Sequence, residues 1–221
     1  MSADDKNSKF HVVFVVLDLD RTLIDSSLLA RFLVEYYAPE DQREQEIAAI
    51  EAHRGGSYDA LTFLHAKYGQ KGRVDASKLV ELHGWKYLAD TLLLPGASAV
   101  FHELDSRAIP YGIFTKGGKD FQALKVALLC AMVGEKAIPH LVTSSDQKAA
   151  YITKHWWDEN EKAFTVPGQL TGASEIKAHR VIIVDDKLEN LTPSHGAITP
   201  YHVSVNTVQT FIDSIDQIIY S

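Results

Sequence analysis

Apolar runs alternate along the chain with stretches of helical periodicity. The run from His11 to Leu17 is continuous and rich in β-branched residues, which is typical of a strand buried on both faces. Shorter runs predict further strands at residues 111–114, 140–143, 180–184 and 202–205. Helices are predicted at residues 96–107 and 120–133, and a last one beginning near Thr207. This alternation predicts an α/β fold with three layers, α/β/α, around a central, mostly parallel sheet.

One interval, residues 26–91, breaks the alternation because it contains no convincing strand. Its helical stretches at 26–38, 40–54, 58–67 and 75–90 are separated by Pro39, by Gly55-Gly56 and by glycines between Gly69 and Gly72. We therefore predict an α/β core made of residues 10–25 and 92–221, and an inserted all-helical cap domain at 26–91. A second irregular stretch, residues 158–177, is predicted to be a loop or a short excursion.

Composition and charge narrow the class of protein. The 221 residues are 46% hydrophobic, which excludes a disordered chain, and the net charge of −7 argues against binding to nucleic acid. The single cysteine, Cys130, cannot form an internal disulfide or a thiolate zinc site. The polar residues 1–9 lack the apolar core of a signal peptide, and no apolar stretch is long enough to span a membrane. We expect a cytoplasmic protein with no membrane partner; the oligomeric state is left open.

Candidate chemistry lies where the predicted strands end. Asp18-Leu19-Asp20-Arg21-Thr22 follows the first strand, Thr115-Lys116-Gly117-Gly118 the second, and Asp185-Asp186 the fourth, with Lys148 just beyond the third. The carboxyl ends of parallel strands meet at one edge of a sheet, where ligands bind. Four carboxylates need a cation, and an all-oxygen set suits Mg²⁺. A hydroxyl, a glycine-rich turn and a lysine suit a phosphoryl group, so the set predicts phosphoryl transfer.

The same segments resemble motifs of the haloacid dehalogenase superfamily. Asp18–Leu23 resembles its first motif, Phe114–Gly117 its second and Val184–Asn190 its fourth, while Leu94–Val100 is similar to the segment that leads back from a helical cap. The resemblance covers about residues 10–205. It implies a hydrolase with a Rossmann-like core and a helical cap of the C1 type.

The resemblance also implies roles for single residues. Asp18 would be the nucleophile that forms an aspartyl-phosphate and a ligand of Mg²⁺. Asp20 would be general acid and then general base, with its backbone carbonyl on the metal, and the surrounding anionic charge would raise its pKa. Thr115 and Lys116 would bind the phosphoryl group. The remaining metal ligands would be Asp185 and Asp186.

The third motif of the superfamily requires a lysine near a helix start between the third and fourth strands. Lys148 has the expected position and is favoured, while Lys154 and Lys162 are rivals because the interval before Asp185 is long. Three further positions depart from the usual pattern. Arg21 stands where glycine is most common, Lys116 where asparagine is usual, and Asn190 where many relatives have a second acid.

We therefore expect a Mg²⁺-dependent phosphatase that acts on a small phosphorylated metabolite. Alternatives within the superfamily are a sugar phosphomutase and a phosphonatase; dehalogenation is disfavoured because Asp20 supplies the proton-transfer group typical of phosphatases. The alternative from another class is a phospho-accepting, receiver-like signalling module. A catalytically silent relative is disfavoured by the intact acids. Polar and aromatic residues of the insert are candidates for selecting the substrate: Ser26, Arg31, Tyr36, Tyr37, Arg54, Tyr58, His65 and Lys67.

Overall fold

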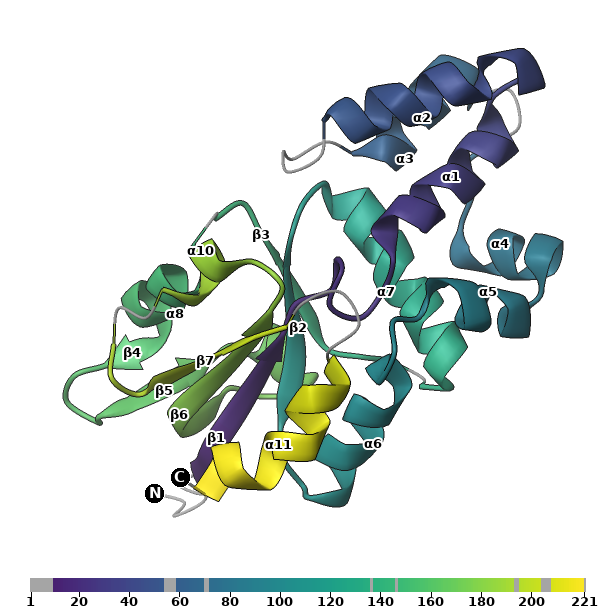
Figure 1. The fold of residues 1–221 in the computed structure, drawn as a ribbon. Coiled ribbons are helices and arrows are strands. Elements are labelled where there is room, and N and C mark those ends of the chain that lie inside the picture. The colour runs from purple at the N-terminus through teal and green to yellow at the C-terminus, as the bar shows by residue number, and fades with distance from the viewer. Residues whose placement is uncertain are drawn as a thin grey trace, which may run out of the picture.

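A single mixed sheet forms the centre of the computed structural model (Figure 1), which describes residues 10–53, 59–69, 72–135, 137–145, 147–192, 195–203 and 208–220. Within these residues the sheet has seven strands in the order β3-β2-β1-β6-β5-β4, with β7 also paired to β6. The strands are β1 (Phe10–Leu17), β2 (Tyr111–Lys116), β3 (His140–Thr143), β4 (Trp157–Asp158), β5 (Ala163–Val166), β6 (Ile176–Asp185) and β7 (Ile198–His202).

Strand β1 lies in the middle of the sheet, in parallel pairing with β2 and β6. Leu17, its last residue, is in register with Ile113 of β2 and Val184 of β6. On its side away from β1, β6 pairs with two strands: antiparallel β5 pairs with residues 176–178, and parallel β7 pairs with residues 181–185. The carboxyl ends of β1, β2 and β6 therefore lie side by side, which is the edge where the sequence places its acids.

Both faces of the sheet are buried, as the apolar run in β1 predicts. Val13, Val15 and Leu17 belong to a large cluster with side chains of α6 (Ala97–Ser106), α7 (Lys119–Val133) and α11 (Val208–Tyr220). Phe14 and Val16 face the other way, into a second cluster with α8 (Lys148–Trp156), α9 (Gly168–Thr171) and α10 (Leu188–Leu191). The predicted three-layer α/β/α arrangement is thus confirmed.

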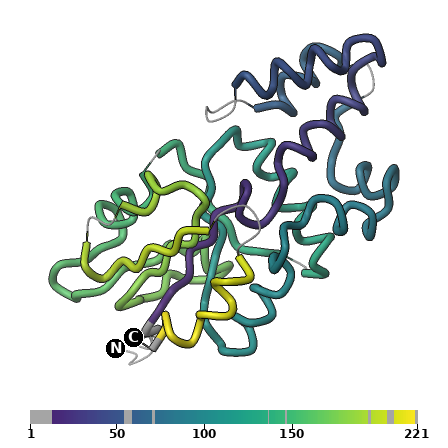
Figure 2. Tube along the Cα trace, viewed as in Figure 1, coloured from purple at the N-terminus to yellow at the C-terminus, as the bar shows by residue number. Residues whose placement is uncertain are grey.

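A helical insert separates β1 from β2. Its elements are α1 (Ser26–Tyr37), a 3₁₀ turn η1 (Glu40–Gln42), α2 (Arg43–Ala52), α3 (Ala60–Tyr68), α4 (Ala76–His83) and α5 (Trp85–Leu92). The chain leaves the core at residues 23–25 and returns to it at residues 92–94. Two backbone hydrogen bonds join these segments: the Asp25 amide donates to the Leu92 carbonyl, and the Leu94 amide donates to the Leu23 carbonyl. Figure 2 shows the course of the chain from the core into the insert and back.

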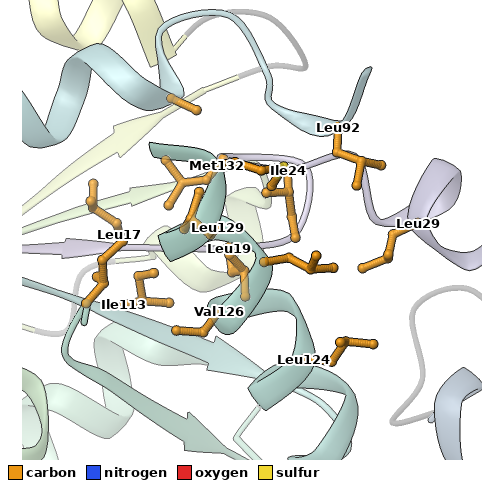
Figure 3. Packing of buried hydrophobic residues seen from close by; sticks show 14 of the residues in the cluster. Leu17, Leu19, Ile24, Leu29, Leu92, Ile113, Leu124, Val126, Leu129 and Met132 are labelled. Atoms are coloured by element: carbon orange, nitrogen blue, oxygen red, sulfur yellow. The ribbon is translucent and has the colours of Figure 1, made fainter. Parts of the chain in front are cut away.

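Helix α7 is covered on both sides, by the sheet and by helices α3, α4 and α5 of the insert. Its apolar residues Val126, Leu129 and Met132 share one buried cluster with residues of β1 and with Leu29 and Leu92 of the insert (Figure 3). The hydrophobic core is therefore continuous between the α/β layers and the helical insert.

Three sequence-based predictions need correction. The strand predicted at 202–205 overlaps β7 (Ile198–His202) only at its first residue, and residues 204 and 205 lie outside the described part of the chain. β7 contains Pro200, which is tolerated because among the described residues β7 pairs on one side only, with β6. Residues 158–177 are not a loop, since they carry the antiparallel strands that extend the sheet, the short α9 and the start of β6.

The helix predicted at 75–90 is two helices, α4 and α5. They are separated at Gly84, whose φ of 80° lies in the left-handed region that glycine tolerates. Thr207, the predicted start of the last helix, lies outside the described residues. Across the described parts of the chain, we find no helix with the length and apolar character needed to cross a membrane.

Candidate active site

Asp18 and Asp185 meet through the side chain of Lys148. Asp18 directly follows β1, and its amide donates to the Val184 carbonyl at 2.9 Å, which continues the β1–β6 pairing. Lys148, the first residue of α8, donates its Nζ to Asp18 Oδ1 and, at 2.7 Å, to Asp185 Oδ2. Asp18 is 6% exposed, Asp185 0% and Lys148 1%. The ammonium group of Lys148 is therefore a buried positive charge shared by two carboxylates.

Burial and charge change the pKa values of this group. Burial raises the pKa of Asp18 to about 7, because the attraction of Lys148 does not offset desolvation together with repulsion from Asp185 and Asp20. Burial alone would lower the pKa of Lys148, but Asp18 and Asp185 raise it, so the lysine stays charged. The single positive charge of Lys148 therefore does not neutralise the negative charge of the carboxylates around it.

A third carboxylate, Asp186, completes an acidic cluster. Oxygens of Asp18, Asp185 and Asp186 lie within 4.8 Å of one another. Asp186 Oδ2 is 3.5 Å from Arg21 Nε, whereas Asp186 Oδ1 is buried and has no hydrogen-bond partner in the described parts of the chain. Arg21 has a φ of 62°, which explains why glycine suits its position. An orphaned buried oxygen and a clustered set of hard oxygen ligands fit a divalent cation.

Two neighbouring residues line or support this cluster. Asn190, on α10, donates its Nδ2 to both oxygens of Asp185 at 3.0 Å, so the amide orients a carboxylate. Thr115, in β2, is completely buried, and its Oγ1 has no hydrogen-bond partner among the described residues. Thr115 is not among the residues that line the cavity described below, although its chain neighbour Lys116 is.

The structure separates the three candidate lysines. Lys148 touches Asp18, as described above. Lys154 is exposed near the other end of α8, and Lys162 is 70% exposed and paired with Glu159. Lys148 alone among these three reaches the carboxylate cluster.

Asp20 lies in a different environment from Asp18, although it is two residues away. Its Oδ1 accepts hydrogen bonds from Ser26 Oγ and, at 2.6 Å, from Lys125 Nζ, and its Oδ2 accepts one from Gln122 Nε2 at 3.0 Å. Burial acts to raise its pKa, but Lys125, Ser26 and Gln122 outweigh burial and lower it. The expectation of a raised pKa is therefore wrong for the substrate-free protein.

Sequence reasoning missed Gln122 and Lys125. Both lie on α7, which the sequence presents as an apolar helix, and both are buried, at 2% and 3% exposure. The available signal was their spacing: two polar residues three apart lie on one face of a helix.

A cavity of about 480 Å³ opens onto these residues. On the core side it is lined by Asp18, Asp20, Lys116, Lys148 and Asn190, and on the side of the insert by Ala30, Ile47 and Ile50, among others.

Of the candidate selectivity residues, Ser26 and Arg31 line this cavity. Tyr37 and Lys67 bond within the insert instead, to the Val74 amide and to Glu46, and Tyr36 and His65 are not among the residues that line the cavity. Arg54 and Tyr58 lie outside the described residues.

Comparison with known proteins gives a match at the level of structure. No family model and no curated protein matches the sequence. The structure is similar to that of a haloacid dehalogenase-like hydrolase from Burkholderia xenovorans, with a TM-score of 0.52 and 20% identity over 87% of this chain and 82% of that one. The chain has the haloacid dehalogenase fold.

Two further solved structures are more distant. A hydrolase from Pseudomonas syringae has a TM-score of 0.45 and 17% identity over 94% of this chain and 99% of that one. Cytosolic 5′-nucleotidase IIIB bound to cytidine has a TM-score of 0.47 and 13% identity over 93% of this chain and 77% of that one. Both TM-scores are below 0.5. The first comparison shows the haloacid dehalogenase fold.

The acidic cluster generates a test with metal ions. At about 100 times its Kd, a bound divalent cation stabilises a protein by about 2.7 kcal/mol, which for a chain of this size raises Tm by about 5–10 °C. We expect Mg²⁺ or Mn²⁺ to produce such a shift in the wild type, and less than half of it in Asp186→Asn. A scanning-calorimetry titration measures this. The exposed Asp90→Asn is the matched control and should keep the full shift; an equal shift in Asp186→Asn contradicts the site.

Proposed function

We propose that the protein is a Mg²⁺-dependent phosphatase that hydrolyses a small phosphorylated metabolite through an aspartyl-phosphate on Asp18. The observation that carries this proposal is the contact of buried Lys148 with Asp18 at the edge of the sheet, beside two further carboxylates. A buried carboxylate that is held by one ammonium and faces a cavity has the position required of a nucleophile.

The metal would be held by the carboxylates of Asp18, Asp185 and Asp186 and by the backbone carbonyl of Asp20. When bound, Mg²⁺ supplies positive charge that keeps Asp18 ionised and offsets its repulsion of the incoming phosphate. Asn190 orients Asp185 through its two hydrogen bonds. Arg21 limits the freedom of Asp186 by pairing with one of its oxygens.

The first half of the reaction transfers the phosphoryl group to Asp18. A carboxylate oxygen of Asp18 attacks phosphorus, and the bond between phosphorus and the leaving oxygen breaks. Asp20 gives its proton to that oxygen, which leaves as an alcohol. Lys125, Ser26 and Gln122 lower the pKa of Asp20, so the negative charge of the bound substrate would have to raise it again for Asp20 to take this proton from water before the transfer.

The second half returns the enzyme to its starting state. Asp20, now a carboxylate, removes a proton from water as the water oxygen attacks phosphorus. The bond between phosphorus and Asp18 breaks, and inorganic phosphate leaves. The same residue thus acts first as an acid and then as a base, which requires that its position stays fixed through both steps.

Thr115, Lys116 and Lys148 are the groups we assign to the phosphoryl oxygens. The buried Thr115 hydroxyl lacks a partner within the described chain, so a phosphoryl oxygen would satisfy it. Lys148 serves both reacting partners, because the ammonium that holds Asp18 also adds positive charge where charge develops on the transferring group.

We assign residues 26–91 the role of a cap over the site. This role is supported by the cavity, in which Ala30, Ile47 and Ile50 of the insert face the carboxylate edge of the core. A volume of about 480 Å³ accommodates a small metabolite. The leaving group would therefore contact the insert while its phosphate contacts the core.

The proposal is tested with p-nitrophenyl phosphate and Mg²⁺. The wild type should release phosphate catalytically, and Asp18→Asn should lower kcat by at least about 10³-fold because it removes the nucleophile. Asp90→Asn should match the wild type. Hydrolysis by Asp18→Asn at the wild-type rate would show that Asp18 is not the nucleophile, and a stable phosphoprotein without turnover would indicate a signalling module instead.

The lysine assignment has its own comparison on one helix. Lys148→Ala should lower kcat by about 10²–10³-fold, because it removes a charge that acts on the transferred group. Lys154→Ala, on the exposed side of α8, should stay within about twofold. Steady-state kinetics on variants shown to be folded by circular dichroism measures both, and the reverse order of effects excludes Lys148.

A further inference from the structure

Lys125 occupies a position in which an ammonium group requires a specific partner. It lies on α7, between the sheet and the helical insert (Figure 1), and its side chain is 4% exposed. Its neighbours on the buried surface of α7 include Phe121, Leu128 and Leu129, and its Nζ lies 4.0 Å from the centre of the Phe121 ring. An unpaired ammonium is very costly to bury, so the contact of 2.6 Å with Asp20 is the reason that a lysine is tolerated here.

Gln122 holds the second oxygen of the same carboxylate. Its Nε2 donates to Asp20 Oδ2 at 3.0 Å and to the Lys116 carbonyl at 2.8 Å, so it ties Asp20 to the end of β2. The close approach depends on Gly117, whose φ is 151°. A Cβ built there would lie 2.3 Å from Gln122 Nε2. The glycine turn after β2 therefore makes room for this hydrogen bond.

Both oxygens of Asp20 are thus occupied by donors that lie outside the acidic cluster. Ser26 and Lys125 hold Oδ1, and Gln122 holds Oδ2. The carboxylate of Asp20 is absent from the cluster of Asp18, Asp185 and Asp186, although it is two residues from Asp18. A cation that binds such a cluster attracts any carboxylate nearby, so Asp20 needs other partners to stay free for proton transfer.

We infer that Lys125 is a positioning residue, which fixes the Asp20 carboxylate at the edge of the cavity and away from the metal ligands, with Gln122 as its second support. This inference rests on the proposed function, because Asp20 is the group that transfers the proton in both halves of the reaction. Lys125 and Gln122 also line the cavity, and we assign them to Asp20 rather than to the substrate because their side chains bond to its two carboxylate oxygens. A misplacement of about 1 Å in a proton-transfer group lowers its rate strongly, so the support should be visible in kcat.

A double-mutant cycle with p-nitrophenyl phosphate tests this inference. Lys125→Met should lower kcat by about 10–100-fold, as loss of a group that orients a functional residue does, and leave KM within about threefold. In the Asp20→Asn background the same substitution should change kcat by less than about twofold, because the carboxylate it positions has been removed. Lys119→Met, at the exposed start of the same helix, is the matched control and should match the wild type.

Two further measurements keep the test decisive. A primary amine such as ethylammonium, added to Lys125→Ala, should restore part of kcat, whereas it should not change the rate of Lys119→Ala. If Lys125→Met does not fold, Gln122→Met leaves no buried lysine unpaired and should lower kcat by about 3–10-fold, again without an added loss in Asp20→Asn.

The outcomes are distinguishable. If Lys125→Met and Gln122→Met hydrolyse at the wild-type rate, the positioning role is wrong and the proposed function stands. A large rise in KM, or a loss of kcat that persists in the Asp20→Asn background, shows that Lys125 binds substrate or serves the fold alone, which also overturns the inference. A wild-type protein that hydrolyses no phosphoester with Mg²⁺ overturns the proposed function and the inference together.

Discussion

The buried ammonium of Lys148 is the interaction on which the arrangement of the site depends. It joins Asp18, at the end of β1, to Asp185, at the end of β6, and so compensates part of the negative charge that two adjacent parallel strands bring together. Part of this charge remains, as the raised pKa of Asp18 and the unpartnered oxygen of Asp186 show. A buried cluster with one lysine is therefore suited to a divalent cation, and the net charge of the whole chain says little about its ligands.

The second feature of the site is the separation of two aspartates by environment. Asp18 shares a lysine with other carboxylates, and burial raises its pKa. Asp20 is surrounded by donors from two different parts of the chain, Ser26 of the insert and the α7 residues Gln122 and Lys125. Two carboxyl groups in such different surroundings are suited to different chemical roles. Helix α7 connects these surroundings to the fold, because it packs on the sheet and on the insert at once.

The order of buried strands and the edge that carries the acids could be predicted from sequence, because strands buried on both faces form continuous apolar runs and parallel strands end at one edge. The position of β7 and the hairpin within residues 158–177 could not, since short edge strands that contain proline or only two residues have no distinctive pattern. Asp18, Lys148 and Asp185 were found through their places at strand ends. Gln122 and Lys125 were not, because their role depends on tertiary contacts with Asp20, about one hundred residues away in sequence.

The central claim is that Asp18 carries the phosphoryl group during turnover. Rapid acid quenching of a reaction with Mg²⁺ and a phosphoester, followed by peptide mass spectrometry, tests it most directly. The Asp20→Asn variant is the best sample, because loss of the base should slow breakdown of the intermediate more than its formation from a substrate with a good leaving group. We expect phosphorylation of the peptide that contains Asp18, at Asp18, and in the wild type a rate of formation at least equal to turnover. A phosphoryl group on another residue, or one that forms more slowly than turnover, contradicts the claim.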